Sequence, residues 1–399
     1  MDSGQPAADS RLKAAAQREW RQLKHRPWDL AMISWVPLLA VALMGWIFAA
    51  GLPNQLPIGV LDQDHSRLSR QLTRFLQAAP GLQVVHQASD PAQAAAALKR
   101  GEVYAMVEIP PDFAQSIKQG QAAQVTLLHN AQFGTHSGLI QRDVRLAVGT
   151  LSAGIEISVR TQRGESAQAA RVSMEPIQAS MITLFNPSLN YEQFLASALI
   201  PALLHILAMT AGAWAVGREL RDRTLPQWFA ANASDLQVLA ALCGKLIFPV
   251  VSLTGIGLLF LLWMTLGRGW QPAGSLSWVL LALFIFIALS VALGALAAAV
   301  TRSLSMSLSF TGFVTAPAFA FSGVAFPLLS MPVLARWWAN ALPYTHYIRV
   351  QIEQLQMGAP VRYSVSTLAG LTLALVAAVL LCSLGLRQAA QDPGSWGKR

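Results

Sequence analysis

Six long apolar segments limit the fold of this chain more than any other feature of its sequence. A helix needs about 20 apolar residues to cross a bilayer, and an unpaired backbone cannot cross it. Charged residues make up only 12% of the chain, against about 25% in a soluble domain. The sequence therefore predicts an α-helical membrane protein with six transmembrane helices. The predicted spans are Ala31–Ala50, Phe194–Gly217, Leu246–Leu266, Trp278–Val300, Ser305–Phe326 and Thr367–Leu386.

The basic residues beside these spans predict their orientation. The chain has 29 Lys and Arg against 20 Asp and Glu. Thirteen basic residues flank the spans on the side of the two termini, and four lie in the short loops opposite. Because cytoplasmic loops carry the excess of Lys and Arg, both termini are predicted to be cytoplasmic. We expect a multi-pass protein of the bacterial inner membrane. No basic stripe with interleaved aromatic residues indicates a nucleic-acid partner.

Residues 1–30 are predicted to form a cytoplasmic helix that lies in the membrane interface. Leu12, Ala16, Trp20 and Leu23 share one face at helical spacing, and basic residues occupy the rest. Pro27 would supply the bend into the first span. The alternative is a helical stub with no role at the interface.

A polar stretch of residues 51–193 separates the first span, residues 31–50, from the remaining spans in residues 194–399. Short β-type runs alternate with helix signals in a βαβαβαβ pattern, which one or two long helices follow between about residues 136 and 181. Long loops cross the membrane regardless of charge. We therefore predict an external, periplasmic α/β domain. Its predicted interior contains Val60, Leu61, Val84, Val85, Met106, Val107, Val125 and Leu127.

The sequence shows no catalytic or metal-binding motif. It has no Gly-x-x-x-x-Gly-Lys-Ser/Thr phosphate loop, no zinc signature and no nucleophile motif. No acidic residue falls inside the six apolar segments, which weighs against an ion-coupled antiporter. His205 is a candidate for the substrate path, although a hydrogen bond between helices is the favoured explanation. Lys245, at the start of the third span, is interpreted as an interfacial anchor.

Several motifs together resemble one family. Residues 58–69 (IGVLDQDHSRLS) are similar to the V-x-D-x-D-x-S-x-x-S opening of the external domain in bacterial type-2 ABC exporter permeases, which have the type V exporter fold. Residues 97–113 (ALKRGEVYAMVEIPPDF) and Phe185-Asn186-Pro187 resemble further family segments. The most characteristic similarity is SGVAFP at residues 322–327, followed by Met331-Pro332 and by LPYTH at 342–346.

The resemblance implies a permease that binds separate ATPase subunits through a short cytoplasmic helix between spans two and three, within residues 218–239. The family pattern R-E-x-E-x-G-T-L is matched here at Glu219, Thr224 and Leu225, whereas Arg221 and Arg223 replace a glutamate and a glycine. These five residues are the predicted coupling site, and Glu219 and Thr224 are expected to lie on a helix that contacts the ATPase. Charge reversal at Glu219 is expected to uncouple transport and leave expression intact. A positive-inside loop without coupling function is the alternative.

The prolines and aromatic residues of residues 327–362 predict a broken, re-entrant region at the outer leaflet. The family places an outer gate there. The matching residues are Ser322, Gly323, Phe326, Pro327 and Pro332.

The resulting hypothesis is a permease that exports hydrophobic or amphipathic compounds. It would hold no cofactor or metal itself, with ATP and Mg bound by the partner ATPase, and it would pair with a second permease that is identical or related. Arg223 in place of glycine favours a heterodimer. Membrane lipid is an expected partner, and a periplasmic adaptor protein is a further candidate. The alternative from another class is an envelope scaffold or receptor whose external domain binds a partner.

Overall fold

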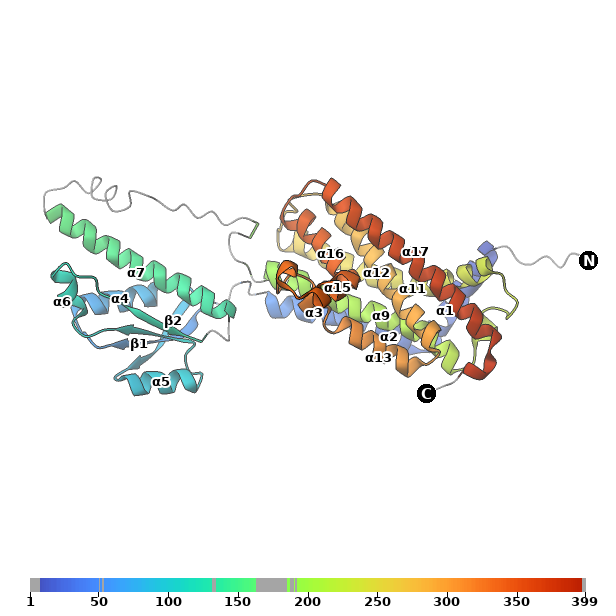
Figure 1. Ribbon diagram of the computed structural model, residues 1–399, viewed down its shortest axis with the longest axis horizontal. Helices are drawn as coiled ribbons and strands as arrows, with labels where there is room; N and C mark the ends of the chain where they lie inside the picture. The colour runs from blue at the N-terminus through green and yellow to red at the C-terminus, as the bar shows by residue number, and fades with distance from the viewer. Residues whose placement is uncertain are drawn as a thin grey trace, which may run out of the picture. The chain divides into compact units, whose positions relative to one another are not determined.

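The chain forms two compact units in a computed structural model (Figure 1). The first unit contains residues 1–49 and 184–399, and the second is residues 50–183, inserted into the first. The structure describes residues 8–49, 51, 54–130, 134–162, 185–186, 190 and 192–396.

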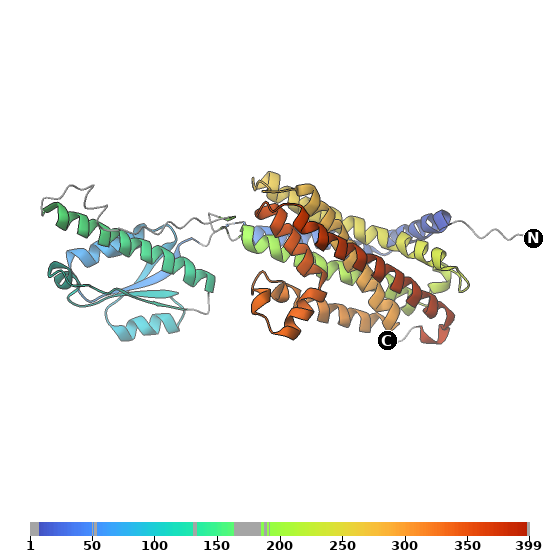
Figure 2. The same cartoon turned by 45° about the horizontal axis from the view of Figure 1, so that its top comes forward.

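The first unit is a bundle of long helices (Figures 1 and 2). Six helical stretches in the described residues are long and apolar enough to cross a membrane, which agrees with the six predicted spans. The first span is broken at Ser34, and the fifth ends at Phe321, five residues earlier than predicted. The helices of these spans are α2 (Pro27–Ile33) with α3 (Trp35–Phe48), η1 (Glu192–Ala196) with α9 (Ser197–Arg221), α11 (Asp235–Leu262) with η2 (Trp263–Gly267), α12 (Leu276–Thr301), α13 (Leu304–Thr315) with α14 (Ala318–Phe321), and α17 (Arg362–Gln391).

Shorter elements lie at the ends of the bundle. One end carries α1 (Ala8–His25), which precedes Pro27 and the bend into α2, and α10 (Leu225–Trp228) between α9 and α11. The helices α15 and α16 lie toward the opposite end (Figure 1). The remaining elements are η3 (Leu328–Ser330), α15 (Val333–Ala341), α16 (Pro343–Gln351), η4 (Ile352–Gln356) and η5 (Pro393–Ser395).

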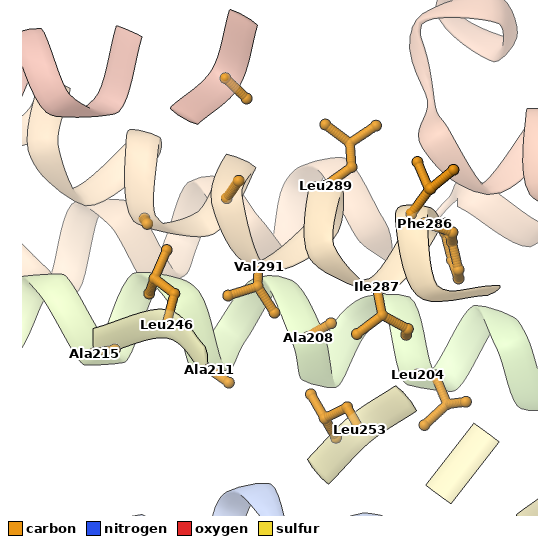
Figure 3. Packing of buried hydrophobic residues seen from close by; sticks show 14 of the residues in the cluster. Leu204, Ala208, Ala211, Ala215, Leu246, Leu253, Phe286, Ile287, Leu289 and Val291 are labelled. Carbon is orange, nitrogen blue, oxygen red and sulfur yellow. The ribbon is translucent and has the colours of Figure 1, made fainter. Parts of the chain in front are cut away.

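Helices α9 and α12 form the centre of the bundle and pack backbone to backbone. A Cβ atom added at Gly212 would lie 1.9 Å from the carbonyl oxygen of Val291, and one at Gly294 would lie 1.9 Å from that of Met209. Small residues let membrane helices approach this closely. Figure 3 shows Ala208 and Ala211 of α9 beside Val291 of α12 in the same packed region. A larger side chain at either glycine would therefore force the two helices apart.

Arg268 connects three segments at the end of the bundle that carries η2. Its guanidinium group donates to the main-chain carbonyl of Ala49 at 2.6 Å and to the Glu192 carboxylate at 2.8 and 2.9 Å. Ala49 follows α3 and Glu192 begins η1, so Arg268 holds together the points where the chain leaves the bundle and returns to it. The Glu192 side chain is fully buried there.

The inserted unit is an α/β domain with a four-stranded sheet of order β2-β1-β3-β4. Strand β1 pairs in parallel with β2 and β3, and β4 pairs antiparallel with β3. The helices α4, α6 and α7 pack on one face through one apolar cluster, and α5 covers the other. The elements are β1 (Leu56–Asp62), α4 (Arg67–Ala78), β2 (Leu82–Ala88), α5 (Pro91–Lys99), β3 (Ala105–Ile109), α6 (Phe113–Lys118), β4 (Thr126–His129) and α7 (Gly134–Gln162).

The acidic motif after β1 has a structural role in this domain. Asp62 accepts hydrogen bonds from the amides of Asp64 and His65 and from the Ser69 hydroxyl, at 2.7 to 3.1 Å. Ser66 caps α4 by accepting from two main-chain amides. The motif therefore fixes the turn that joins the central strand to its first helix.

Of the eight residues predicted for the interior of the domain, four are buried, three are partly buried against the core and Val85 is exposed. Val60, Leu61, Met106 and Val107 are at most 2% exposed. Val85 is 50% exposed because it lies on the edge strand β2, at the point where the register with β1 shifts and leaves Val85 without a partner in the pairing. The first predicted long helix is α7, and the continuation predicted up to residue 181 falls outside the described residues.

Candidate functional site

The chain turns sharply where α9 ends, and Arg223 occupies the turn. The amide of Thr224 bonds to the carbonyl of Glu219 at 2.9 Å, and that of Arg223 bonds to the carbonyl of Leu220 at 3.3 Å. This pair of bonds is the Schellman motif, which requires a left-handed residue between the helix and its last donor. Arg223 supplies it with φ of 58°. The arginine therefore takes the conformation that the family's glycine would provide, and the backbone of the turn needs no adjustment.

The short helix α10 presents one face to the protein and one to solvent. Leu225 and Trp228 are buried, and the Trp228 indole donates to the carbonyl of Ala241 in α11 at 3.2 Å. Pro226 and Gln227 are exposed, as is Arg223 just before them. A partner that binds this loop would meet the exposed residues, while Leu225 fixes the helix from beneath.

Glu219 lies inside the protein rather than on this surface. Its carboxylate is 1% exposed and accepts two hydrogen bonds from Arg18 of α1, each 2.9 Å long. It also pairs with the Lys245 ammonium of α11 at 2.8 Å and accepts a bond from the Thr224 hydroxyl. Glu219 therefore lies in the last turns of α9 rather than in the short helix α10, and its carboxylate offers no surface to a partner. Its position is that of a residue that holds the loop.

Lys245 is buried as well, which corrects its interpretation as an interfacial anchor. The helix α11 begins ten residues before it, so Lys245 lies well within that helix. Its ammonium pairs with Glu19 of α1 as well as with Glu219, and lies 5.0 Å from the ring centre of Trp228. It therefore binds α1, α9 and α10 to α11 at once.

A second centre of the same network forms around Arg218. Its guanidinium pairs with Glu19 and with Asp29 of α2, and donates to Gln22 at 2.9 Å. The Trp214 indole also donates to Asp29, at 2.9 Å. Arg218 thus connects α9 to both α1 and α2.

Six charged side chains from α1, α2, α9 and α11 pair with one another here, and we call them the buried charge network. It contains three cations and three anions, so its formal charges cancel. A buried ion is tolerated only when it is paired and hydrogen-bonded, and removing one partner costs about 3–5 kcal/mol. The network therefore fixes four helices in one mutual arrangement directly behind α10. Its members are Arg18, Glu19, Asp29, Arg218, Glu219 and Lys245.

Sequence reasoning missed the part of this network that α1 contributes. The buried face of α1 is centred on Ala15, Glu19 and Leu23, whereas the predicted apolar face included Trp20, which is 42% exposed. A Cβ atom at Gly244 would lie 2.4 Å from the carbonyl oxygen of Leu12, so α1 lies directly against α11. The available signal in the sequence was that Glu19 lies four residues from both Ala15 and Leu23, and therefore on the same helix face as these apolar residues.

Arg221 and its neighbour are exposed beside the network. Arg221 pairs with Asp222 at 2.8 Å, and Arg26 contacts the same carboxylate at 3.2 Å. The hydrogen bond from Arg221 lowers the pKa of Asp222 below its usual value. Of the five predicted coupling residues, only Arg221 and Arg223 therefore lie on the surface.

His205 lies between the two central helices. It is fully buried, and its Nδ1 bonds to the Ser290 hydroxyl of α12 at 2.8 Å, while Ser290 donates to the carbonyl of Phe286. This is the geometry of the interhelical hydrogen bond that the sequence analysis favoured.

The predicted outer-gate residues lie in the irregular segment that follows α14. Ser322 is buried and donates to the carbonyl of Phe319, and Gly323 has a φ of 89° that favours glycine. Phe326 is 51% exposed, and Pro327 and Pro332 directly precede η3 and α15. The structure thus brings these five residues into one broken stretch between α14 and α15.

Comparison with known proteins identifies the class. Residues 27–386 match the ABC-2 family transporter protein family, and the chain belongs to it. The chain is 22% identical to the probable multidrug ABC transporter permease YbhS of Escherichia coli K12, over 85% of this chain and 86% of that one. It is also 22% identical to ABC transporter G family member 20 of Dictyostelium discoideum, over 80% of this chain and 43% of that protein. The chain is thus a multi-pass membrane permease, the non-catalytic part of an ABC transporter.

The first prediction concerns Glu219. Glu219→Lys would leave four cations facing two carboxylates in the buried charge network, so we expect a loss of about 3–5 kcal/mol in the free energy of unfolding. Expression should fall, contrary to the expectation from sequence. The matched control is Asp235→Lys, because Asp235 is exposed and pairs with Arg387 at the surface. Denaturant unfolding of the purified protein measures both, and equal stabilities would contradict the role of the network.

The second prediction concerns the turn at Arg223. Arg223→Gly should leave stability unchanged or raise it by up to about 1 kcal/mol, because glycine adopts positive φ without steric strain. Arg221→Gly, in the last turn of α9, is the control and should lower stability by about 1 kcal/mol. Thermal unfolding of the two variants compares them, and a larger loss for Arg223→Gly would show that the arginine side chain itself stabilises the turn.

Proposed function

We propose that this permease exports hydrophobic or amphipathic compounds, driven by a separate ATPase that binds the exposed face of α10. The observation that carries the proposal is the position of α10 directly in front of the buried charge network. Leu225 and Trp228 seat the helix on the bundle, and Thr224 connects it to Glu219. A displacement of α10 therefore acts on helices that are joined by buried ion pairs, and separating these pairs costs several kcal/mol.

The network gives the displacement a route into the spans. Glu219 pairs with Arg18 and Lys245, so α1 and α11 must follow α9 or lose buried ion pairs. Breaking one pair costs several kcal/mol, which makes movement of these helices as a group the less costly response. ATP and Mg would be bound by the ATPase, and this chain would contribute only the mechanical connection.

The remaining assignments extend the same proposal. The end of the bundle with α1 and α10 faces the cytoplasm of a bacterium, where the flanking Lys and Arg residues are concentrated. The α/β domain is then periplasmic, and the segment with Ser322, Gly323 and Phe326 forms the outer gate. A second permease, identical or related, completes the pathway, and a periplasmic adaptor is a candidate partner of the α/β domain. The similarity to a probable multidrug permease supports an apolar substrate class.

The third prediction tests the ATPase contact. Arg223→Glu reverses a charge on the exposed loop without entering the network, so it should lower permease-dependent stimulation of the ATPase at least about tenfold, as loss of roughly 1.4 kcal/mol of binding would. The thermal unfolding temperature should stay unchanged. Lys13→Glu is the control, since Lys13 is exposed on α1 outside the loop. Full stimulation by both variants would place the ATPase elsewhere.

The fourth prediction tests the orientation. A cysteine at the exposed Gln119 of the α/β domain should react with a membrane-impermeant maleimide in intact cells, in a background without Cys243 and Cys382. A cysteine at the exposed Ala231, after α10, should react only once the membrane is broken. The reverse pattern would overturn the topology and with it the proposed direction of transport.

A further inference from the structure

The bundle has a cavity that neither the coupling loop nor the gate segment explains. It has a volume of about 490 Å³ and is lined by residues of α12, α15, α16 and α17. Small-molecule sites in proteins typically have volumes of about 300–1,000 Å³. None of the buried charge network and none of the predicted gate residues lines it.

Along α17, the lining of the cavity changes from polar to apolar. On α17, Ser366 and Thr367 lie near the beginning of the helix, and Leu371 and Ala374 lie further along it. With a rise of about 1.5 Å per residue, Ser366 and Ala374 are about 12 Å apart along the axis. Leu289 of α12 adds to the apolar part. A molecule that fits this lining has a polar end near the start of α17 and a hydrocarbon part beyond it.

The polar part of the cavity contains one arginine, which is ion-paired with a glutamate one turn further along. Arg349 of α16 is the one lining residue with a permanent charge in the described residues. Its Nε donates to Glu353 at 3.0 Å, and its side chain is 67% exposed. His346, one helical turn earlier, also lines the cavity and is held through Nε2 by the carbonyl of Asn340 at 2.7 Å. Guanidinium groups bind phosphate in a fixed geometry.

We infer that this cavity binds one phospholipid with an anionic headgroup, taken from the membrane leaflet at the α16 end of the bundle. Arg349 holds the phosphate, Ser366 and Thr367 lie beside the headgroup, and an acyl chain lies along Leu289 and Leu371. The guanidinium of Arg349, which is 67% exposed beside its ion pair with Glu353, and the polar start of α17 favour this occupant over a wholly apolar molecule. The inference does not depend on the direction of transport or on the ATPase contact.

The chain offers a substitution that fills the cavity without disturbing the packing. Gly370 lines it, and a Cβ atom added there would meet no atom within 4 Å. Gly370→Leu should therefore occupy the space of the acyl chain and leave the helices in place. Gly255 in α11 is the matched control, because it is equally open and does not line the cavity.

The fifth prediction measures lipid retention by native mass spectrometry of the full chain in detergent with added dioleoylphosphatidylglycerol. Wild type and Gly255→Leu should retain one lipid per chain, and Gly370→Leu should retain none. Arg349→Gln should weaken retention about fivefold, as loss of about 1 kcal/mol of headgroup attraction would. Arg362→Gln, an exposed arginine outside the cavity, should not change it.

Three outcomes would overturn the inference. Equal retention by Gly370→Leu and Gly255→Leu would place the lipid elsewhere. Equal retention of dioleoylglycerol, which lacks the phosphate, would remove the role of Arg349. Equally tight binding of glycerol 1-phosphate would show that the cavity takes the headgroup alone. Thermal unfolding of each variant confirms that it is folded before its lipid is counted.

Discussion

The pairing of buried charges at one end of the bundle is the constraint on which the rest of this structure depends. Arg218, Glu219 and Lys245 are each at most 2% exposed, and such groups are stable in a protein only with partners of opposite charge. Their partners include Arg18 and Glu19 of α1, which precedes the first span, and Asp29 of α2, at the start of that span. The N-terminal helix is therefore an integral part of the bundle, and the position of α10 follows from the same set of ion pairs.

Local sequence patterns were sufficient for the elements that a single physical rule determines. The six spans followed from hydrocarbon thickness, and the α/β order of the inserted domain followed from short β-type runs between capped helices, such as Asp62 to Ser69. Glu19 could not be placed in this way. Its burial depends on a partner 226 residues away in Lys245, and no local pattern contains that information.

The same limit explains the errors at Glu219 and Lys245. From sequence, a charged residue at the end of an apolar segment is most simply assigned to the interface, where water solvates it. In the structure both residues lie beneath α1, because Gly244 permits the backbone of α1 to approach α11 closely. Gly244 lies within a helix and not in a turn, and such a glycine indicates a close contact with another helix. The close contact determines whether the neighbouring charges are solvated by water or paired with one another.

The contact of Arg268 with Ala49 and Glu192 has a consequence for how such a protein can vary. Arg268 of the bundle holds Ala49 and Glu192, which lie on either side of the inserted domain, close together. The distance between these two points therefore does not depend on which domain is inserted. The entropy of closing the loop is then small for any insert with neighbouring termini. Lineages that share this bundle could exchange, shorten or enlarge the inserted domain without repacking a single membrane helix.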